Sequence, residues 1–137
     1  MGTESENSVS FFRFEDLRIY AKSLEYTRWV HGVINMFPPE SQNNLGNNFV
    51  KSAQAIALNI AEGSARNKSQ FIYYLKMAKS AVRECVVYTA ICYDQQLFSE
   101  DNNEQSRNQL MELTKMIGSL IASLQRSVPN MKDEDED

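Results

Sequence analysis

Few side chains in this sequence have the types and the spacing that chemistry requires. Asn59 and Glu62 are the only polar side chains after Gln54 in a run of small residues that ends at Gly63. Their i, i+3 spacing places them on one face of a helix. Catalysis would need a second acid or a base beside them, and the sequence shows no evident candidate. We expect a structural role, in which a partly buried polar pair fixes helix register or subunit contacts through hydrogen bonds.

The other reactive groups are two cysteines and one histidine. Cys85 and Cys92 lie in one predicted helix, about 10 Å apart along its axis at ~1.5 Å per residue. That separation is too great for a disulfide between them. A metal would need further ligands, and His31, the only histidine, is far away in the sequence. We therefore predict two reduced core thiols, a surface or interface histidine, no metal, no cofactor and no enzymatic activity.

The main functional indication is the segregation of charge along the chain. The net charge of −4 equals that of residues 129–137, which hold one lysine and five acids. The remainder is balanced, with 13 basic residues (14 − 1) and 13 acidic residues (18 − 5). Within it, residues 51–83 contain six basic residues against Glu62 alone. We call these six the basic set: Lys51, Arg66, Lys68, Lys76, Lys79 and Arg83.

Two interpretations of the basic set remain open. At about 100° per residue, Lys76, Lys79 and Arg83 fall within ~60° of one another on the outer side of their helix. They could contact phosphates, with nearby tyrosines stacking on unpaired bases. Alternatively, they form a solvated face with salt bridges to Glu84 or to a neighbouring subunit. The acidic residues 129–137 either solubilise the protein or compete with nucleic acid for the basic set.

Composition indicates one helical domain. Five glycines and three prolines in 137 residues argue against a sandwich or barrel built on many turns. We predict an all-α fold, an antiparallel up-and-down four-helix bundle over residues 14–128, between a flexible segment (1–13) and an acidic disordered tail (129–137). No apolar run approaches the ~18 residues of a membrane span. The first residues lack a signal-peptide pattern. We expect a cytoplasmic protein without membrane contact.

Hydrophobic periodicity and capping residues place the four helices. The first two are predicted over residues 15–36 and 45–65, with Gly63 as a left-handed C-terminal cap. The third begins after Asn67, an N-cap followed by Gln70 as in a capping box. The fourth begins after Ser99, a second N-cap, and stops before Pro129.

The first helix carries two apolar stripes. The expected core stripe consists of Leu17, Tyr20, Leu24, Thr27, Val30 and Ile34. A second stripe contains Ile19, Tyr26, Trp29, Val33 and Met36. A monomeric bundle needs one stripe per helix, so Ile19, Tyr26, Trp29 and Val33 are candidates for a subunit interface. The alternative is a wide core stripe with a half-exposed Trp29.

Several segments carry a family resemblance. They are Phe14 to Leu17, Phe37-Pro38, Ser52 to Gly63 ending in Asn-Ile-Ala-Glu-Gly, Ser64 to Arg66, Ser69 to Leu75, and Ala78 to Glu84. Over residues 14–128 the chain resembles the bacterial four-helix-bundle proteins grouped as ribosomal RNA intervening-sequence proteins. Asn59, Glu62, Gly63 and Glu84 are the signature residues in this comparison.

The resemblance implies a four-helix bundle assembled as a ring-shaped homopentamer, without an assigned enzymatic activity. A related protein, the accessory variability determinant of diversity-generating retroelements, is a basic pentamer that binds nucleic acid. This chain departs from the family by having Val50-Lys51 where a pair of arginines is common, and by its acidic tail. We expect a non-enzymatic pentamer that binds RNA or single-stranded DNA without strong sequence preference. The alternative is a protein–protein adaptor.

Overall fold

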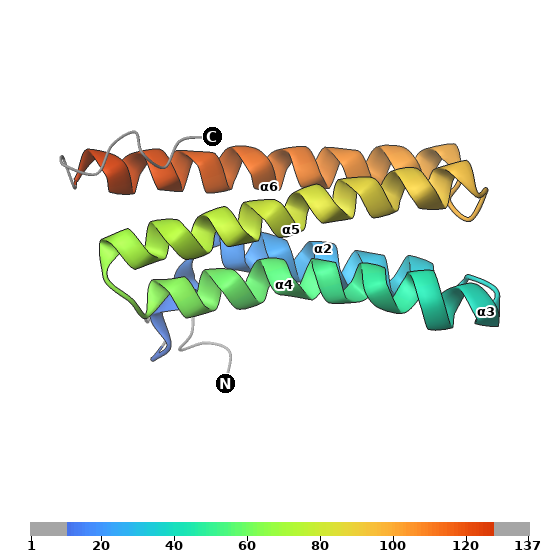
Figure 1. Cartoon of the computed structure of the whole chain (residues 1–137), viewed down its shortest axis with the longest axis horizontal. Coiled ribbons are helices and arrows are strands. Elements are labelled where there is room, and N and C mark those ends of the chain that lie inside the picture. The colour runs from blue at the N-terminus through green and yellow to red at the C-terminus, as the bar shows by residue number, and fades with distance from the viewer. Residues whose placement is uncertain (1–10, 128–137) are drawn as a thin grey trace, which may run out of the picture.

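The structure, a computed structural model, describes residues 11–127, and this range contains helices and turns but no strand. The elements are η1 (Arg13–Asp16), α2 (Arg18–Ile34), α3 (Pro39–Ser41), η2 (Gln42–Gly46), α4 (Asn47–Ser64), α5 (Lys68–Asp94) and α6 (Glu100–Arg126). In Figure 1 the four long helices α2, α4, α5 and α6 lie alongside one another, with short connections at their ends. The predicted all-α class is confirmed. The predicted tail, residues 129–137, and residues 1–10 of the N-terminal segment lie outside the described residues.

The helix starts follow from local side-chain hydrogen bonds. The Asn67 side-chain oxygen accepts from the Gln70 backbone N–H (2.9 Å), and Ser99 Oγ accepts from the Asn102 N–H (3.0 Å). The Asn102 side-chain oxygen in turn accepts from the Ser99 N–H, which completes a capping box. Both predicted N-caps are confirmed. By contrast, α2 starts at Arg18 rather than at residue 15, because Arg13–Asp16 form a separate 3-10 turn.

The segment between α2 and α4, which lies between the first two predicted helices, is itself helical. Pro39 occupies the first turn of α3, where its missing N–H costs no hydrogen bond. A π-type turn (Gln42–Gly46) then leads directly into α4. Its last residue, Gly46, is buried against Ile34 of α2, where an added Cβ would lie 2.7 Å from Ile34 Cγ2. The chain therefore re-enters a helix sooner than its polar composition suggests.

Burial along α2 corrects the two-stripe prediction. The buried residues of this helix are Ile19, Ser23, Tyr26, Val30 and Ile34. This line runs between the two predicted stripes because α2 packs against both α4 and α6. Leu24, expected in the core, is 38% exposed. Ile19 and Tyr26 are 5% and 0% exposed, so their proposed place in a subunit interface is wrong: this chain already covers them. Trp29 and Val33 are half-buried.

Each long helix makes its principal contacts with two others. The helix α2 packs on α4 and α6, and α5 packs on the same two helices. The order around the molecule is therefore α2, α4, α5, α6, which places the α2–α4 seam opposite the α5–α6 seam. On α5, Leu75, Ala78, Val82, Cys85, Thr89 and Cys92 are all buried, which confirms the predicted core position of the two cysteines, and Phe71 is half-buried. On α6 the buried residues are Ser106, Leu110, Leu113, Ile117 and Ile121.

Gly63 is a packing residue and not the predicted left-handed cap. Among the described residues no glycine has a positive φ, and Gly63 lies inside α4, which continues to Ser64. A Cβ at this position would lie 2.6 Å from Tyr74 Cβ and 2.9 Å from Phe71 Cδ1. Glycine is needed here because α5 approaches the α4 backbone too closely for any side chain. The left-handed conformation occurs instead at Gln96 (φ 64°), in the α5–α6 turn.

A chain of buried hydroxyl groups joins three helices. Tyr26 Oη lies 2.8 Å from Ser106 Oγ, which lies 2.7 Å from Thr89 Oγ1. Thr89 donates to the Cys85 carbonyl at 2.8 Å. Each hydroxyl has one hydrogen, so Thr89 must accept from Ser106, and Ser106 must accept from Tyr26. Burial raises the pKa of the Tyr26 phenol, since the interior disfavours its charged form. These bonds connect α2, α6 and α5 within the apolar core.

Candidate nucleic-acid interface

The structure divides the basic set among three places. Lys51, on α4, lines a shallow depression on the α2–α4 seam, together with His31, Asn35 and Asn47. Arg66 lies in the connection between α4 and α5 and forms an ion pair with Glu62. The remaining four residues, Lys68, Lys76, Lys79 and Arg83, all belong to α5. We call these four the α5 basic row. The six residues therefore do not form one patch.

The α5 basic row runs along the side of α5 that faces α6. Lys68 Nζ donates to Ser127 Oγ, just beyond the end of α6, at 3.1 Å. At the other end, Ala90 lines a depression between α5 and α6. Arg83 lies seven residues before Ala90, and seven residues at about 100° each make nearly two full turns. Arg83 therefore lies on the same face of α5 as Ala90, the face beside α6. Lys76 and Lys79 are half-buried and Arg83 is exposed. The predicted outer ridge is thus a row beside the α5–α6 seam.

Glu84 does not neutralise this row. Ser52 Oγ, on α4, donates to Glu84 Oε1 at 2.8 Å, and this bond directs the carboxylate toward α4. Within residues 11–127, neither Lys79 nor Arg83 forms an ion pair. Glu84 is therefore a link between α4 and α5, and its partner Ser52 was not anticipated. The row keeps a local excess of positive charge at the surface.

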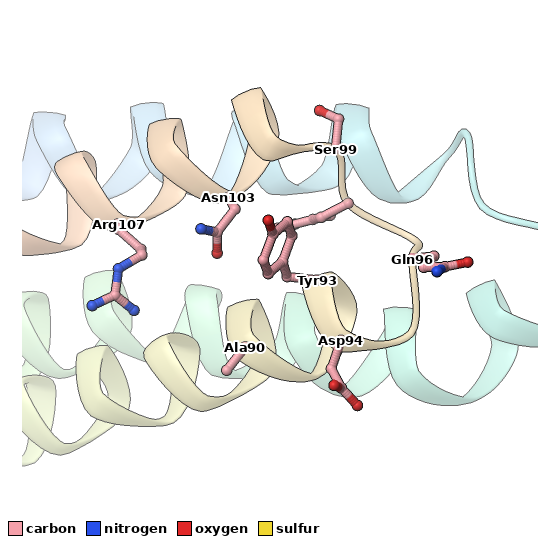
Figure 2. Close-up of a pocket in the computed structure, with 8 residues that line it drawn as sticks. Ala90, Tyr93, Asp94, Gln96, Ser99, Asn103 and Arg107 are labelled. Carbon is pink, nitrogen blue, oxygen red and sulfur yellow. The ribbon is translucent and has the colours of Figure 1, made fainter.

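Arg107 lies at the α5–α6 seam beyond Arg83, beside Glu100, Asp101 and Glu104, and was not predicted from the sequence. It lines an open depression of about 780 Å³ together with Ala90, Tyr93 and Asn103. Figure 2 shows Arg107 and Asn103 on α6 facing Ala90 and Tyr93 on α5, and Asp94 and Gln96 also line this depression. A guanidinium, a carboxamide and a phenol can together bind a phosphate and stack on a base. The signal was hidden because acids surround Arg107 in the sequence: Glu100, Asp101, Glu104 and Glu112.

The predicted pair of Asn59 and Glu62 does not form. Asn59 Nδ2 donates to the Ala55 carbonyl of its own helix at 2.9 Å. Glu62 is exposed and bonds Arg66, whose Nε lies 3.0 Å from Glu62 Oε2. The prediction of a partly buried pair is therefore wrong for Glu62. The guanidinium of Arg66, four residues further along the chain, attracts the Glu62 carboxylate toward the surface. The same bond raises the pKa of Arg66, which also lies over the Tyr74 ring at 5.3 Å. Arg66 is thus less available to phosphates than the α5 basic row.

Comparison with known proteins identifies the family. Residues 15–119 match the family described as 23S rRNA-intervening sequence protein. The chain belongs to this family. A similar solved structure is that of a protein of unknown function from the S23 ribosomal protein family of Bacteroides thetaiotaomicron. The two share 19% identity and a TM-score of 0.67, over 76% of this chain and 95% of the other. That similarity supports the fold alone. No curated protein matches the chain.

In this intervening-sequence protein the cysteines are buried and free. Burial raises the pKa of the Cys92 thiol to about 12, and burial together with nearby Glu84 raises the pKa of Cys85. His31 is exposed, as expected for a surface histidine. In the described part of the chain, no three His, Cys, Asp or Glu side chains are grouped as metal ligands would be. None of the described helices combines the length and apolarity that crossing a bilayer requires.

Proposed function

We propose that this 23S rRNA-intervening sequence protein is a non-enzymatic, cytoplasmic homopentamer that binds RNA or single-stranded DNA weakly. Each chain is an antiparallel up-and-down four-helix bundle, and the assembled ring presents the α5 basic row to the nucleic acid. One observation carries the proposal: Glu84 bonds to Ser52 on α4, while Lys79 and Arg83 have no ion pair among the described residues. The charges of Lys79 and Arg83 are thus available to phosphates.

The neighbourhood of the row supports the same function. Arg107 and Asn103 add donors at the Arg83 end, and Tyr93, 42% exposed, offers a ring for base stacking. Binding through phosphates releases counterions, so the logarithm of the affinity falls with the logarithm of salt concentration by about 0.7 per phosphate on single strands. A ring of identical chains would repeat the row and raise the overall affinity by multivalency.

The test is a titration with fluorescent RNA, single-stranded DNA and duplex DNA at rising salt. We expect dissociation constants in the micromolar range or tighter for the single strands, weakening as salt rises. The triple variant Lys76→Glu, Lys79→Glu and Arg83→Glu should abolish binding. The matched control is Lys51→Glu, which changes the same kind of charge on the opposite α2–α4 seam and should retain binding.

Light scattering on the same samples gives the number of subunits. Five chains of 15.7 kDa correspond to about 78 kDa. Trp29 and Val33, half-buried within one chain, remain candidates for the contact between subunits. An intact pentamer without affinity for any nucleic acid at low salt would contradict the nucleic-acid function. A monomer that binds RNA would contradict only the ring.

An adaptor for another protein is the second candidate, because α5 also exposes apolar side chains. Tyr73, Met77 and Val87 are 58%, 43% and 54% exposed, respectively. Their i, i+4 and i+14 spacing places them near one face of α5, as in helices that pack against a partner. Binding through such a face would persist at high salt, whereas phosphate binding would not. The salt series therefore separates the two functions.

A further inference from the structure

The described part of the chain ends beside the α5 basic row. The helix α6 ends at Arg126, and the next residue, Ser127, accepts a hydrogen bond from Lys68 Nζ. Lys68 is the first residue of the row. The chain beyond Ser127 reads Val-Pro-Asn-Met-Lys-Asp-Glu-Asp-Glu-Asp, with five consecutive acids from Asp133 to Asp137. The last described residue, Ser127, thus lies at one end of the row.

The length of the segment matches the length of the row. Lys76 and Arg83 lie about 12 and 22 Å from Lys68 along the axis of α5, at ~1.5 Å per residue. The five acids follow Ser127 by six to ten residues of chain. A flexible chain of that length spans about 13–18 Å on average, and about 20–33 Å when extended. The acids can therefore reach every cation of the row.

Charge complementarity favours the row over other surfaces. The segment from Val128 to Asp137 has one lysine and five acids. Two cations of the row, Lys79 and Arg83, have no ion pair within residues 11–127, and Glu84, the acid next to Arg83 in the sequence, bonds to Ser52 on α4. On the α2 side of α6, by contrast, Lys22 is already paired with Glu112 and Glu25. Tethering keeps the acids at an effective concentration in the millimolar range.

We propose that residues 133–137 dock on the α5 basic row and shield it from other polyanions. This regulation rests on the proposed nucleic-acid function, but docking itself does not. Any RNA must then displace the acidic segment, and the protein gains affinity when that segment is removed or neutralised. From the sequence, this competition and a solubilising role were both open. The bond between Lys68 and Ser127 and the orientation of the row are what favour competition.

Docking is tested first by carbodiimide cross-linking of the full chain, which couples lysine amines to carboxylates in contact with them. We expect links from residues 133–137 to Lys68, Lys76 and Lys79, reduced several-fold at about 0.5 M salt because screening weakens exposed ion pairs. Lys51, on the opposite seam, and Lys115, on the α2 side of α6, are internal controls. Equal coupling to these two lysines would overturn the inference.

Shielding is tested with a neutral tail of the same length. The variant carries Asp133→Asn, Glu134→Gln, Asp135→Asn, Glu136→Gln and Asp137→Asn. We expect it to bind single-stranded RNA roughly tenfold more tightly than the natural chain at low salt, with the gap closing as salt rises. Cross-links to the row with equal RNA affinities would overturn the shielding.

The two experiments also separate this inference from the proposed function. If the α5 lysines are cross-linked and neither chain binds any nucleic acid, docking is supported and the nucleic-acid function fails. If both chains bind RNA equally and the cross-links show no preference for α5, the proposed function stands and the inference is overturned.

Discussion

Two glycines inside helices should respond in opposite ways to alanine. Gly63→Ala introduces a Cβ within 2.6 Å of Tyr74 Cβ, which belongs to a packed helix and not to a flexible tip. We expect a loss of about 1–3 kcal/mol in the free energy of unfolding. At Gly118, in α6, an added Cβ would have nothing within 4 Å, and Gly118→Ala should stabilise by about 0.5–1 kcal/mol. Urea unfolding measures both, and equal effects would contradict the packing role of Gly63.

Two buried thiols and a buried phenol should lower the free energy of unfolding at alkaline pH. Folding raises the pKa of Cys92, Cys85 and Tyr26 above their ordinary values of 9.0 for cysteine and 10.0 for tyrosine. Each group stays neutral in the folded chain while the unfolded chain ionises. The contribution to stability is therefore complete below about pH 9 and is lost as the pH rises above it.

We expect the urea midpoint to be constant between about pH 7 and 8 and to decline above pH 9. The double variant Cys85→Ala and Cys92→Ala should show a shallower decline. A thiol reagent at about pH 8 should leave both cysteines of the folded protein unmodified and react with both in denaturant. Rapid reaction in the folded state would show that the thiols are accessible.

At the scale of elements, the buried hydroxyl groups connect three helices through α6, because Ser106 on α6 bonds both Tyr26 on α2 and Thr89 on α5. Tyr26→Phe removes one bond and leaves Ser106 donating to Thr89, so it should cost about 1 kcal/mol. Ser106→Ala removes two bonds and leaves the buried Tyr26 hydroxyl without its acceptor, so we expect about 2–3 kcal/mol. Thr114→Ala is the control, since its hydroxyl bonds the Leu110 carbonyl at the surface of the same helix. Similar costs for Ser106→Ala and Thr114→Ala would contradict a buried network.

The sequence predicts the helices well where the determinants are local. Asn67 and Ser99 cap their helices with their own side chains, and the apolar period of α5 follows its buried face. The centre of α2 could not be predicted in this way. Its buried line includes Ser23, a polar residue, and passes between two apolar stripes because two neighbouring helices share the contact.

The sequence predicts which basic residues belong to the candidate site, but it does not predict how the structure arranges them. The excess of basic residues between positions 51 and 83 is visible in the sequence. The separation of Lys51 from the α5 basic row depends on the order of four helices around the core, which no single helix determines. Gly63 shows the same limit: its close neighbours come from α5, so only tertiary contact distinguishes a packing glycine from a cap.

At the scale of the whole molecule, the cations of α5 are concentrated on one seam. If the proposed ring repeats this seam, RNA long enough to span two rows should bind far more tightly than RNA that reaches one. We expect a steep gain in affinity over a narrow range of oligonucleotide length, measured by anisotropy at constant salt. A gain that is merely proportional to length would indicate that each chain binds independently.

The left-handed backbone at Gln96 has a consequence for how such a protein can diverge. A residue with a Cβ at φ 64° costs of order 1 kcal/mol relative to glycine. A lineage that acquires glycine there would gain stability at a turn that borders the depression beside Arg107 (Figure 2). Because most mutations destabilise by about 1 kcal/mol, that gain could absorb a change on the α5 surface. A single turn residue therefore influences how freely the basic row can evolve toward new ligands.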